Sequence, residues 1–279
     1  MTMIEPLEIV PMLCRVAVGG IIFTGATMGI YSLLARQFLR LPIQLPSVDS
    51  IRARPLSSVC AVPVLVVTIL FTLAAASQSK PAQAPSAIEM VAGALFYSVA
   101  MAGTIFGCLA FSKIGFRAAF GLAAGSSTSA VAKGVRYGLE ILPLVLLVSM
   151  GVSSIGESLG FDMRTQEIFD CLSDPHASGW ARAMLIFFAV GIAPVVEEIL
   201  FRGILLPVVL KGRTFLFGAL LTSLYFALMH LHAPSLLSLL VLSVGFSAGY
   251  ASTGSILTPI AMHAVFNLTG LLLFFAEIK

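Results

Sequence analysis

The chain has 279 residues, of which 58% are hydrophobic and only 10% are charged. Soluble proteins carry about 25% charged residues, so the composition excludes an ordinary soluble domain, and the net charge of +3 does not indicate nucleic-acid binding. The four cysteines show no paired C-x-x-C spacing, which argues against a zinc-finger module. We predict an all-α fold, a polytopic transmembrane helix bundle that occupies the whole chain.

Apolar runs of roughly 18–25 residues are long enough to cross a bilayer as helices. The N-terminus lacks a basic segment followed by a clear cleavage site, so the first run is read as a retained span. The sequence predicts about eight spans: Val10–Leu34, Val59–Ala76, Ile88–Phe111, Gly138–Ile155, Ala181–Leu210, Phe215–Leu231, Ser235–Tyr250 and Ile256–Ala276.

The segments between these runs differ in charge. Arg36–Ser58 and Ser112–Tyr137 are basic and are predicted to be loops or surface segments, whereas Glu157–Ser178 is acidic. With alternating sides, the basic loops and the one after Leu210 hold ten of the Lys and Arg residues, against five on the opposite side. By the positive-inside rule the basic side is cytoplasmic, so both termini are predicted to lie outside.

The fifth apolar run is the most unusual. Ala181–Leu210 has 30 residues, about 45 Å as a helix, which is longer than a bilayer core requires. Pro194 lies near its middle and predicts a kink or break just before Glu197. In the seventh run, Gly245-Phe-Ser-Ala-Gly249 has the small-residue spacing of a helix-packing face.

Three charged residues, Glu197, Glu198 and Arg202, lie close together in the middle of the fifth run, where each costs roughly 2.5–3.5 kcal/mol to insert. Glu198 and Arg202 are four residues apart and share a helix face, so we expect an ion pair that supports the structure. Glu197 is rotated by about 100° from Glu198 and is expected to remain free of that pair. A free, buried carboxylate suits a catalytic base.

Further polar residues follow on later spans. His230 ends the segment Phe226-Ala-Leu-Met-His230, and His263 precedes Asn267 by four residues, which places both on one helix face. Carboxylates, imidazoles and an amide that converge between helices suit either metal binding or activation of water. We therefore expect Glu197, His230, His263 and Asn267 to surround one polar cavity within the bundle.

These motifs carry a family resemblance. Glu197-Glu-x-x-x-Arg202, Phe226-x-x-x-His230 and His263-x-x-x-Asn267 occur in this order, together with the flank Ala193-Pro-Val-Val-Glu-Glu-Ile-Leu-Phe-Arg-Gly203. The pattern resembles the CAAX-protease and bacteriocin-processing (CPBP, abortive-infection) family, which includes type II CAAX prenyl endopeptidases. The resemblance covers about Ala181–Phe275, so residues 1–180 are read as four N-terminal spans and 181–279 as the catalytic helices.

The resemblance implies an intramembrane endopeptidase. Glu197 would activate the hydrolytic water, His230 would help to hold it, and His263 and Asn267 would stabilise the oxyanion. Glu198, Arg202 and Phe226 would support them. The implied partners are a peptide or membrane-protein substrate, possibly lipidated, and the lipid bilayer, with no nucleic acid. The implied location is a bacterial cytoplasmic membrane.

Two questions stay open at the level of sequence. A transporter or proton pathway also places carboxylates and histidines inside membranes, and a catalytically silent relative could serve as a scaffold. We favour the enzyme because the first four spans offer almost no titratable groups for a proton path. No cofactor is expected to be obligatory, although Glu197, His230 and His263 could hold zinc or another divalent metal.

Overall fold

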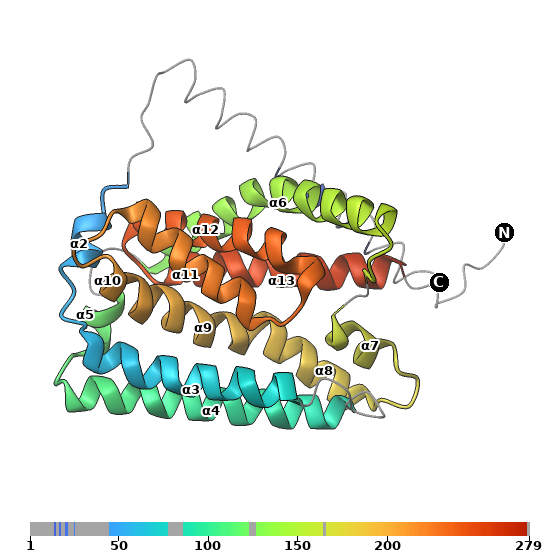
Figure 1. Ribbon diagram of the computed structural model, residues 1–279, viewed down its shortest axis with the longest axis horizontal. Coiled ribbons are helices and arrows are strands. Elements are labelled where there is room, and N and C mark those ends of the chain that lie inside the picture. The colour runs from blue at the N-terminus through green and yellow to red at the C-terminus, as the bar shows by residue number, and fades with distance from the viewer. Residues whose placement is uncertain are drawn as a thin grey trace, which may run out of the picture.

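The computed structural model describes residues 45–77, 86–122, 127–163 and 166–277, and isolated positions between 14 and 25. Figure 1 shows the described residues as a bundle of long helices. The long helices are α3 (Ser58–Ser77), α4 (Ala87–Phe111), α6 (Ser127–Ser158), α11 (Phe215–Met229), α12 (Leu236–Thr253) and α13 (Leu257–Glu277). The short ones are α2 (Val48–Arg52), α5 (Phe116–Phe120), α7 (Glu167–Ser173) and η3 (Ala233–Ser235). The all-α, polytopic prediction is confirmed.

One further helix runs without interruption through Gly179–Val209 and carries the charged motif. It consists of α8 (Gly179–Phe187), the π-helical η1 (Phe188–Ile192), α9 (Ala193–Glu198), the π-helical η2 (Ile199–Leu205) and α10 (Leu206–Val209). Of the kink or break predicted at Pro194, the break is wrong, because the helix is continuous there. Pro194 stands in the first turn of α9, where η1 ends and its missing N–H is tolerated.

Among the described residues, six helices are long and apolar enough to cross a membrane: 58–77, 87–111, 127–158, 179–209, 233–253 and 257–276. They correspond to six of the eight predicted spans. The first predicted span, Val10–Leu34, lies outside the described residues apart from isolated positions. The sixth is shorter than expected, because α11 has 15 residues and ends at Met229, with His230 as its C-cap.

The fourth span begins earlier than the sequence indicated. Ser112–Tyr137 was predicted to be a loop, but α6 starts at Ser127 and includes the second half of that segment. Arg136 is compatible with the helix because its side chain reaches solvent and pairs with Glu140 one turn later, with 2.8 Å between Nε and Oε1. The earlier start gives α6 a length of 32 residues.

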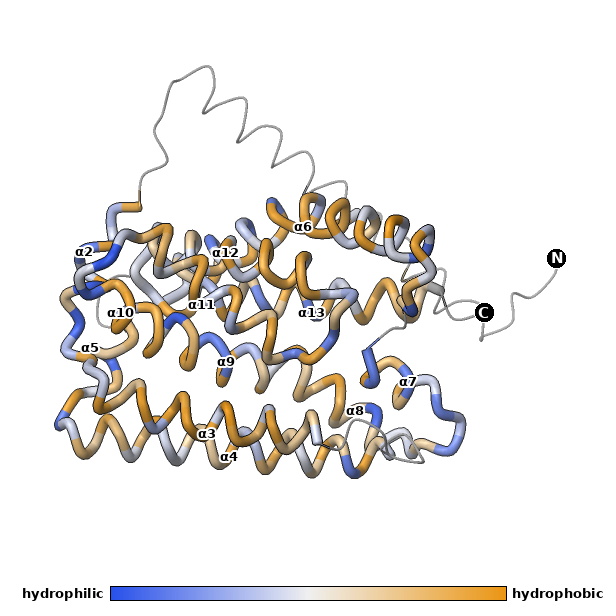
Figure 2. The backbone as a smooth tube through the Cα atoms, in the orientation of Figure 1, coloured by the Kyte–Doolittle hydropathy of each residue, from blue (hydrophilic) through white to orange (hydrophobic). Residues whose placement is uncertain are grey.

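The helices pack as shown in Figure 1, with α3 beside α4, and α6 beside α12 and α13. The approach of α6 to α13 depends on glycine, since a Cβ at Gly134 would meet the Thr258 carbonyl oxygen at 2.4 Å. The long helices are apolar over much of their length (Figure 2), and large side chains such as Leu70 and Phe96 are well exposed. Such surfaces are expected against lipid tails. The division between residues 180 and 181 stays a prediction.

The two ends of the bundle carry different charges. α2, α5 and α10 gather at one end, and α7 lies at the other (Figure 1). At the first end, Arg52 donates to the Leu210 carbonyl oxygen, and Arg54 lies 4.9 Å from the ring centre of Tyr250. Burial lowers the pKa of Arg54 to about 10, so this side chain stays charged at neutral pH. This basic end is the one that the positive-inside rule assigns to the cytoplasm.

A labelling experiment tests that orientation. Arg117→Cys and Glu167→Cys place exposed thiols at the basic end and on α7, respectively. In intact cells, a membrane-impermeant maleimide should label Glu167→Cys, whereas Arg117→Cys should react only after permeabilisation. The unsubstituted protein measures the background from its own cysteines. The reverse labelling pattern would invert the predicted topology.

Candidate active site

The charged motif forms a buried chain of contacts rather than an isolated ion pair. Arg202 Nη1 lies 2.9 Å from Glu198 Oε1, as the four-residue spacing predicted, and both side chains are fully buried. The same Glu198 oxygen lies 2.9 Å from His263 Nδ1 on α13. One carboxylate therefore holds a guanidinium from its own helix and an imidazole from another.

The contact with Glu198 orients the imidazole of His263. A carboxylate only accepts hydrogen bonds, so Nδ1 carries the proton in this pair. His263 Nε2 is then directed to Glu197, whose Oε2 lies 3.9 Å away. That separation is too long for a direct hydrogen bond, and Glu197 Oε2 is itself buried from solvent. Nε2 accepts a hydrogen bond in the neutral ring and donates one in the imidazolium.

Glu197 differs from its neighbour as expected. Its side chain is 20% exposed, whereas that of Glu198 is completely buried. Glu197 Oε2 has no hydrogen-bond partner within the described part of the chain. Of the two adjacent glutamates, Glu198 is held by Arg202 and His263, whereas Glu197 is partly exposed to the space beside His263.

That space is a cavity of about 500 Å³, which lies in the size range of small-molecule and peptide pockets. Glu197, His230, His263 and Asn267 all line it. They come from α9, from the C-cap of α11, and from two positions one turn apart on α13. The structure thus brings all four predicted residues to one cavity, although they are up to 70 residues apart in the sequence.

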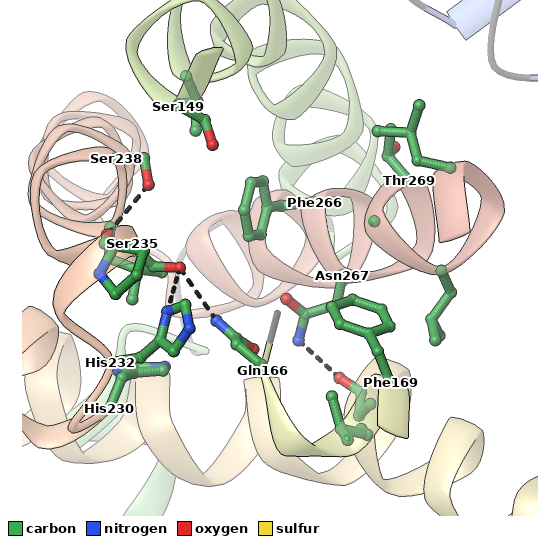
Figure 3. Close-up of a pocket in the computed structure, with 18 of the residues that line it drawn as sticks. Ser149, Gln166, Phe169, His230, His232, Ser235, Ser238, Phe266, Asn267 and Thr269 are labelled. Atoms are coloured by element: carbon green, nitrogen blue, oxygen red, sulfur yellow. Dashed lines mark hydrogen bonds between the residues drawn. The ribbon is translucent and has the colours of Figure 1, made fainter. Parts of the chain in front are cut away.

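Backbone carbonyls restrain the remaining two polar side chains. Asn267 Nδ2 donates to the Ala189 carbonyl oxygen at 2.7 Å, which links α13 to η1 (Figure 3). Unwinding into a π-helix offers such carbonyls to neighbours. His230 Nδ1 lies 2.8 Å from the Phe226 carbonyl oxygen. Because a carbonyl only accepts, His230 carries its proton on Nδ1, which leaves Nε2 of the neutral ring as an acceptor.

The same cavity contains polar residues that the sequence analysis did not select. His232 Nδ1 lies 2.7 Å from Ser235 Oγ, and Gln166 Nε2 reaches that oxygen at 3.5 Å (Figure 3). His232 belongs to none of the motifs in the sequence. Its position two residues after the cap of α11 was the only signal that could have placed it near His230.

The possible metal site is not assembled. Among the residues that the structure describes, no three His, Cys, Asp or Glu side chains are grouped so that they could hold a metal ion. The proposed ligands Glu197, His230 and His263 share the cavity, and each histidine directs its Nδ1 to a protein acceptor, which leaves Nε2 as the ring atom that could ligate a metal. In the described geometry the three side chains do not form a ligand group.

Comparison with known proteins confirms the resemblance for the C-terminal part. Residues 179–269 match a family described as Type II CAAX prenyl endopeptidase Rce1-like. "Putative membrane peptidase YdiL" of Bacillus subtilis (strain 168) is 27% identical over 128 residues, which are 44% of this chain and 50% of that protein. The chain therefore spans about half the length of this curated relative. No solved structure matches it significantly. The family match over residues 179–269 includes Glu197, His230, His263 and Asn267.

Proposed function

We propose that this protein is a membrane-embedded endopeptidase that hydrolyses peptide bonds with a water molecule activated by Glu197. The observation that carries the proposal is the single cavity lined by Glu197, His230, His263 and Asn267 within an apolar helix bundle. Isolated polar groups in a membrane are expensive, whereas groups around a shared water can satisfy one another. The family match over residues 179–269 supports the same activity.

In the proposed reaction, the water oxygen attacks the carbonyl carbon of the scissile bond while Glu197 takes one of its protons. Glu197 is suited to this step because its side chain lines the cavity, is 20% exposed, and accepts no hydrogen bond at Oε2 within the described residues. His230 would orient the water by accepting its second hydrogen at Nε2. Glu197 would then return the proton to the leaving amine nitrogen as the C–N bond breaks.

The carbonyl oxygen becomes an oxyanion during the attack and needs donors. Asn267 uses one amide hydrogen on Ala189, which fixes the side chain and leaves its second hydrogen for the substrate. His263 can donate from Nε2 when both ring nitrogens are protonated. Glu198 beside Nδ1 and Glu197 near Nε2 would stabilise that charge.

Asn267→Ala should reduce kcat by about 10²–10³-fold with little change in KM, because its free amide hydrogen acts on the transition state. Asn267→Asp is the matched control. It keeps the shape of the side chain but places a negative carboxylate beside the developing oxyanion, so its kcat should be reduced at least as much. Steady-state kinetics on a cleavable peptide provide the measurement. An Asn267→Ala variant with unchanged kcat would exclude this residue from the oxyanion site.

We further propose that hydrolysis requires no bound metal, since the cavity residues do not form a ligand group. Activity of the purified protein should therefore survive prolonged treatment with EDTA or 1,10-phenanthroline. A zinc peptidase treated in parallel shows that the chelators work. Loss of activity that added zinc restores would instead place Glu197, His230 and His263 around a metal.

The proposed substrate is a peptide or membrane-protein segment, with or without a lipid modification, that reaches the cavity from the bilayer. Much of the cavity wall is apolar, with Leu142, Val145 and Leu146 from α6 and Leu273 from α13. Such a wall suits side chains or a lipid-modified residue on either side of the reacting bond.

A direct test is incubation of the purified protein in detergent with a mixed peptide library, followed by mass spectrometry of the products. The protein should generate cleavage products, and a Glu197→Ala sample prepared in the same way should not. Products in both samples would indicate a contaminating peptidase. Their absence from both would favour the transporter or scaffold alternative.

A further inference from the structure

Helix α12 contributes no residue to the sequence motifs, yet it forms the wall behind them. The sequence indicated only a packing face at Gly245–Gly249. In the structure, two residues of α12, three positions apart on one helix face, contact the buried series Arg202, Glu198 and His263. These are Ser243 and Phe246, and both are completely buried.

Ser243 holds the guanidinium of Arg202 from the side opposite Glu198. Arg202 Nη2 donates to the Ser243 carbonyl oxygen at 2.8 Å and to its hydroxyl oxygen. Arg202 Nη1 donates to Glu198 in turn. The planar guanidinium is therefore fixed at two of its nitrogens, and its orientation sets where Glu198 Oε1 can lie.

Phe246 contacts both His263 and Arg202, the two residues that flank Glu198. Its ring stacks on the imidazole of His263, with 5.0 Å between ring centres and 27° between planes. It also lies 5.2 Å from the guanidinium carbon of Arg202. Phe226 on α11 meets the same imidazole edge to face, at 5.7 Å and 72°. The imidazole of His263 is thus held between two rings, in addition to its hydrogen bond with Glu198.

We propose that Ser243 and Phe246 are positioning residues of this active site, which direct His263 Nε2 toward the cavity through Arg202 and Glu198. A rotation of the imidazole about its bond to Cβ would break the contact with Glu198 and carry Nε2 away from Glu197. Stacking against Phe246 opposes that rotation, and the doubly held guanidinium opposes a shift of Glu198. Geometry held by supporting residues in this way contributes to the rate rather than to substrate binding.

Two matched pairs of variants test this inference, which rests on the proposed peptidase activity. Phe246→Leu is paired with Tyr250→Leu, which removes an equally buried ring one turn further along α12 that faces Arg54 instead. Ser243→Ala is paired with Ser223→Ala, which removes another fully buried serine hydroxyl, on α11, that has no hydrogen-bond partner within the described residues.

Phe246→Leu and Ser243→Ala should each lower kcat by about 3- to 10-fold with KM unchanged. Tyr250→Leu and Ser223→Ala should keep the kcat of the parent protein, even where thermal unfolding in detergent shows a loss of stability. Equal losses of kcat within each pair would assign all four residues to general packing and overturn the proposal. The milder Ser243→Ala variant keeps the test valid if Phe246→Leu does not fold.

A second readout does not depend on activity. With ¹⁵N-labelled histidine, the side-chain signals of His263 are identified by their loss in His263→Gln, since the chain has only four histidines. Phe246→Leu should remove the ring-current shift from His263, and Ser243→Ala should alter its Nδ1 signal, while Tyr250→Leu should change neither. Unchanged signals in both test variants would refute the positioning role. Shifted signals in a protein without cleavage activity would refute the peptidase proposal alone.

Discussion

Glu197→Gln is expected to abolish peptide hydrolysis while the helix bundle stays folded. The amide has the shape of the carboxylate but cannot take the proton from the attacking water, and general-base catalysis contributes about 10²–10⁴-fold. Glu197 Oε2 has no hydrogen-bond partner to lose within the described residues, so the free energy of unfolding should change by no more than about 0.5 kcal/mol. The measurements are kcat/KM on a cleavable peptide and unfolding in detergent.

Glu140→Gln is a suitable control for this variant. Glu140 also lies on a long apolar helix, but it pairs with Arg136 and does not line the cavity. It should retain the parental kcat/KM. A Glu197→Gln protein with more than a tenth of the parental rate would show that another group activates the water.

Glu198→Gln should instead destabilise the fold, although it differs from the first variant by one position. Removing its charge leaves Arg202 buried without a counter-ion, and such a loss typically costs about 3–5 kcal/mol. Arg202→Met should have an effect of similar size, because it leaves the buried Glu198 carboxylate without its guanidinium, with only His263 beside it. Unfolding in detergent measures both, and equal stability of Glu197→Gln and Glu198→Gln would remove the distinction between the two glutamates.

The double variant Glu198→Gln, Arg202→Met sharpens this comparison. Replacing both members of a buried ion pair is often far less costly than replacing one. The double variant should therefore be more stable than either single variant, while its activity stays low because Ser243 and Phe246 have lost the guanidinium that they hold. Simple addition of the two single losses would show that the pair does not interact.

Much of the fold was predictable from local properties of the sequence. Continuous apolar runs predicted the long helices, and the spacing of Glu198 and Arg202 predicted their contact, because a helix fixes the geometry of residues four apart. The separation of Glu197 from that pair followed from the same rule. We expected the four polar residues from three helices to line one cavity, because isolated polar groups in lipid are costly.

Other features depended on packing that local sequence does not encode. The π-helical turns on both sides of α9 replaced the break predicted at Pro194, because neighbouring helices can satisfy the displaced backbone groups. The hydrogen bond between His263 and Glu198 joins residues that are 65 positions apart in the sequence. The sequence context of Phe246 indicates only a core residue. Its contact with the imidazole of His263 results from the packing of α12 against α13.

The measurement that tests the central claim most directly is a single-turnover cleavage in H₂¹⁸O, with enzyme in excess over a peptide identified from the library. Direct attack by water activated at Glu197 should place one ¹⁸O atom in every new carboxyl terminus, and Glu197→Gln should yield no product above background. A first-turnover product that carries only ¹⁶O would mean that a protein oxygen attacks the carbonyl carbon. Equal product formation by Glu197→Gln would contradict the account altogether.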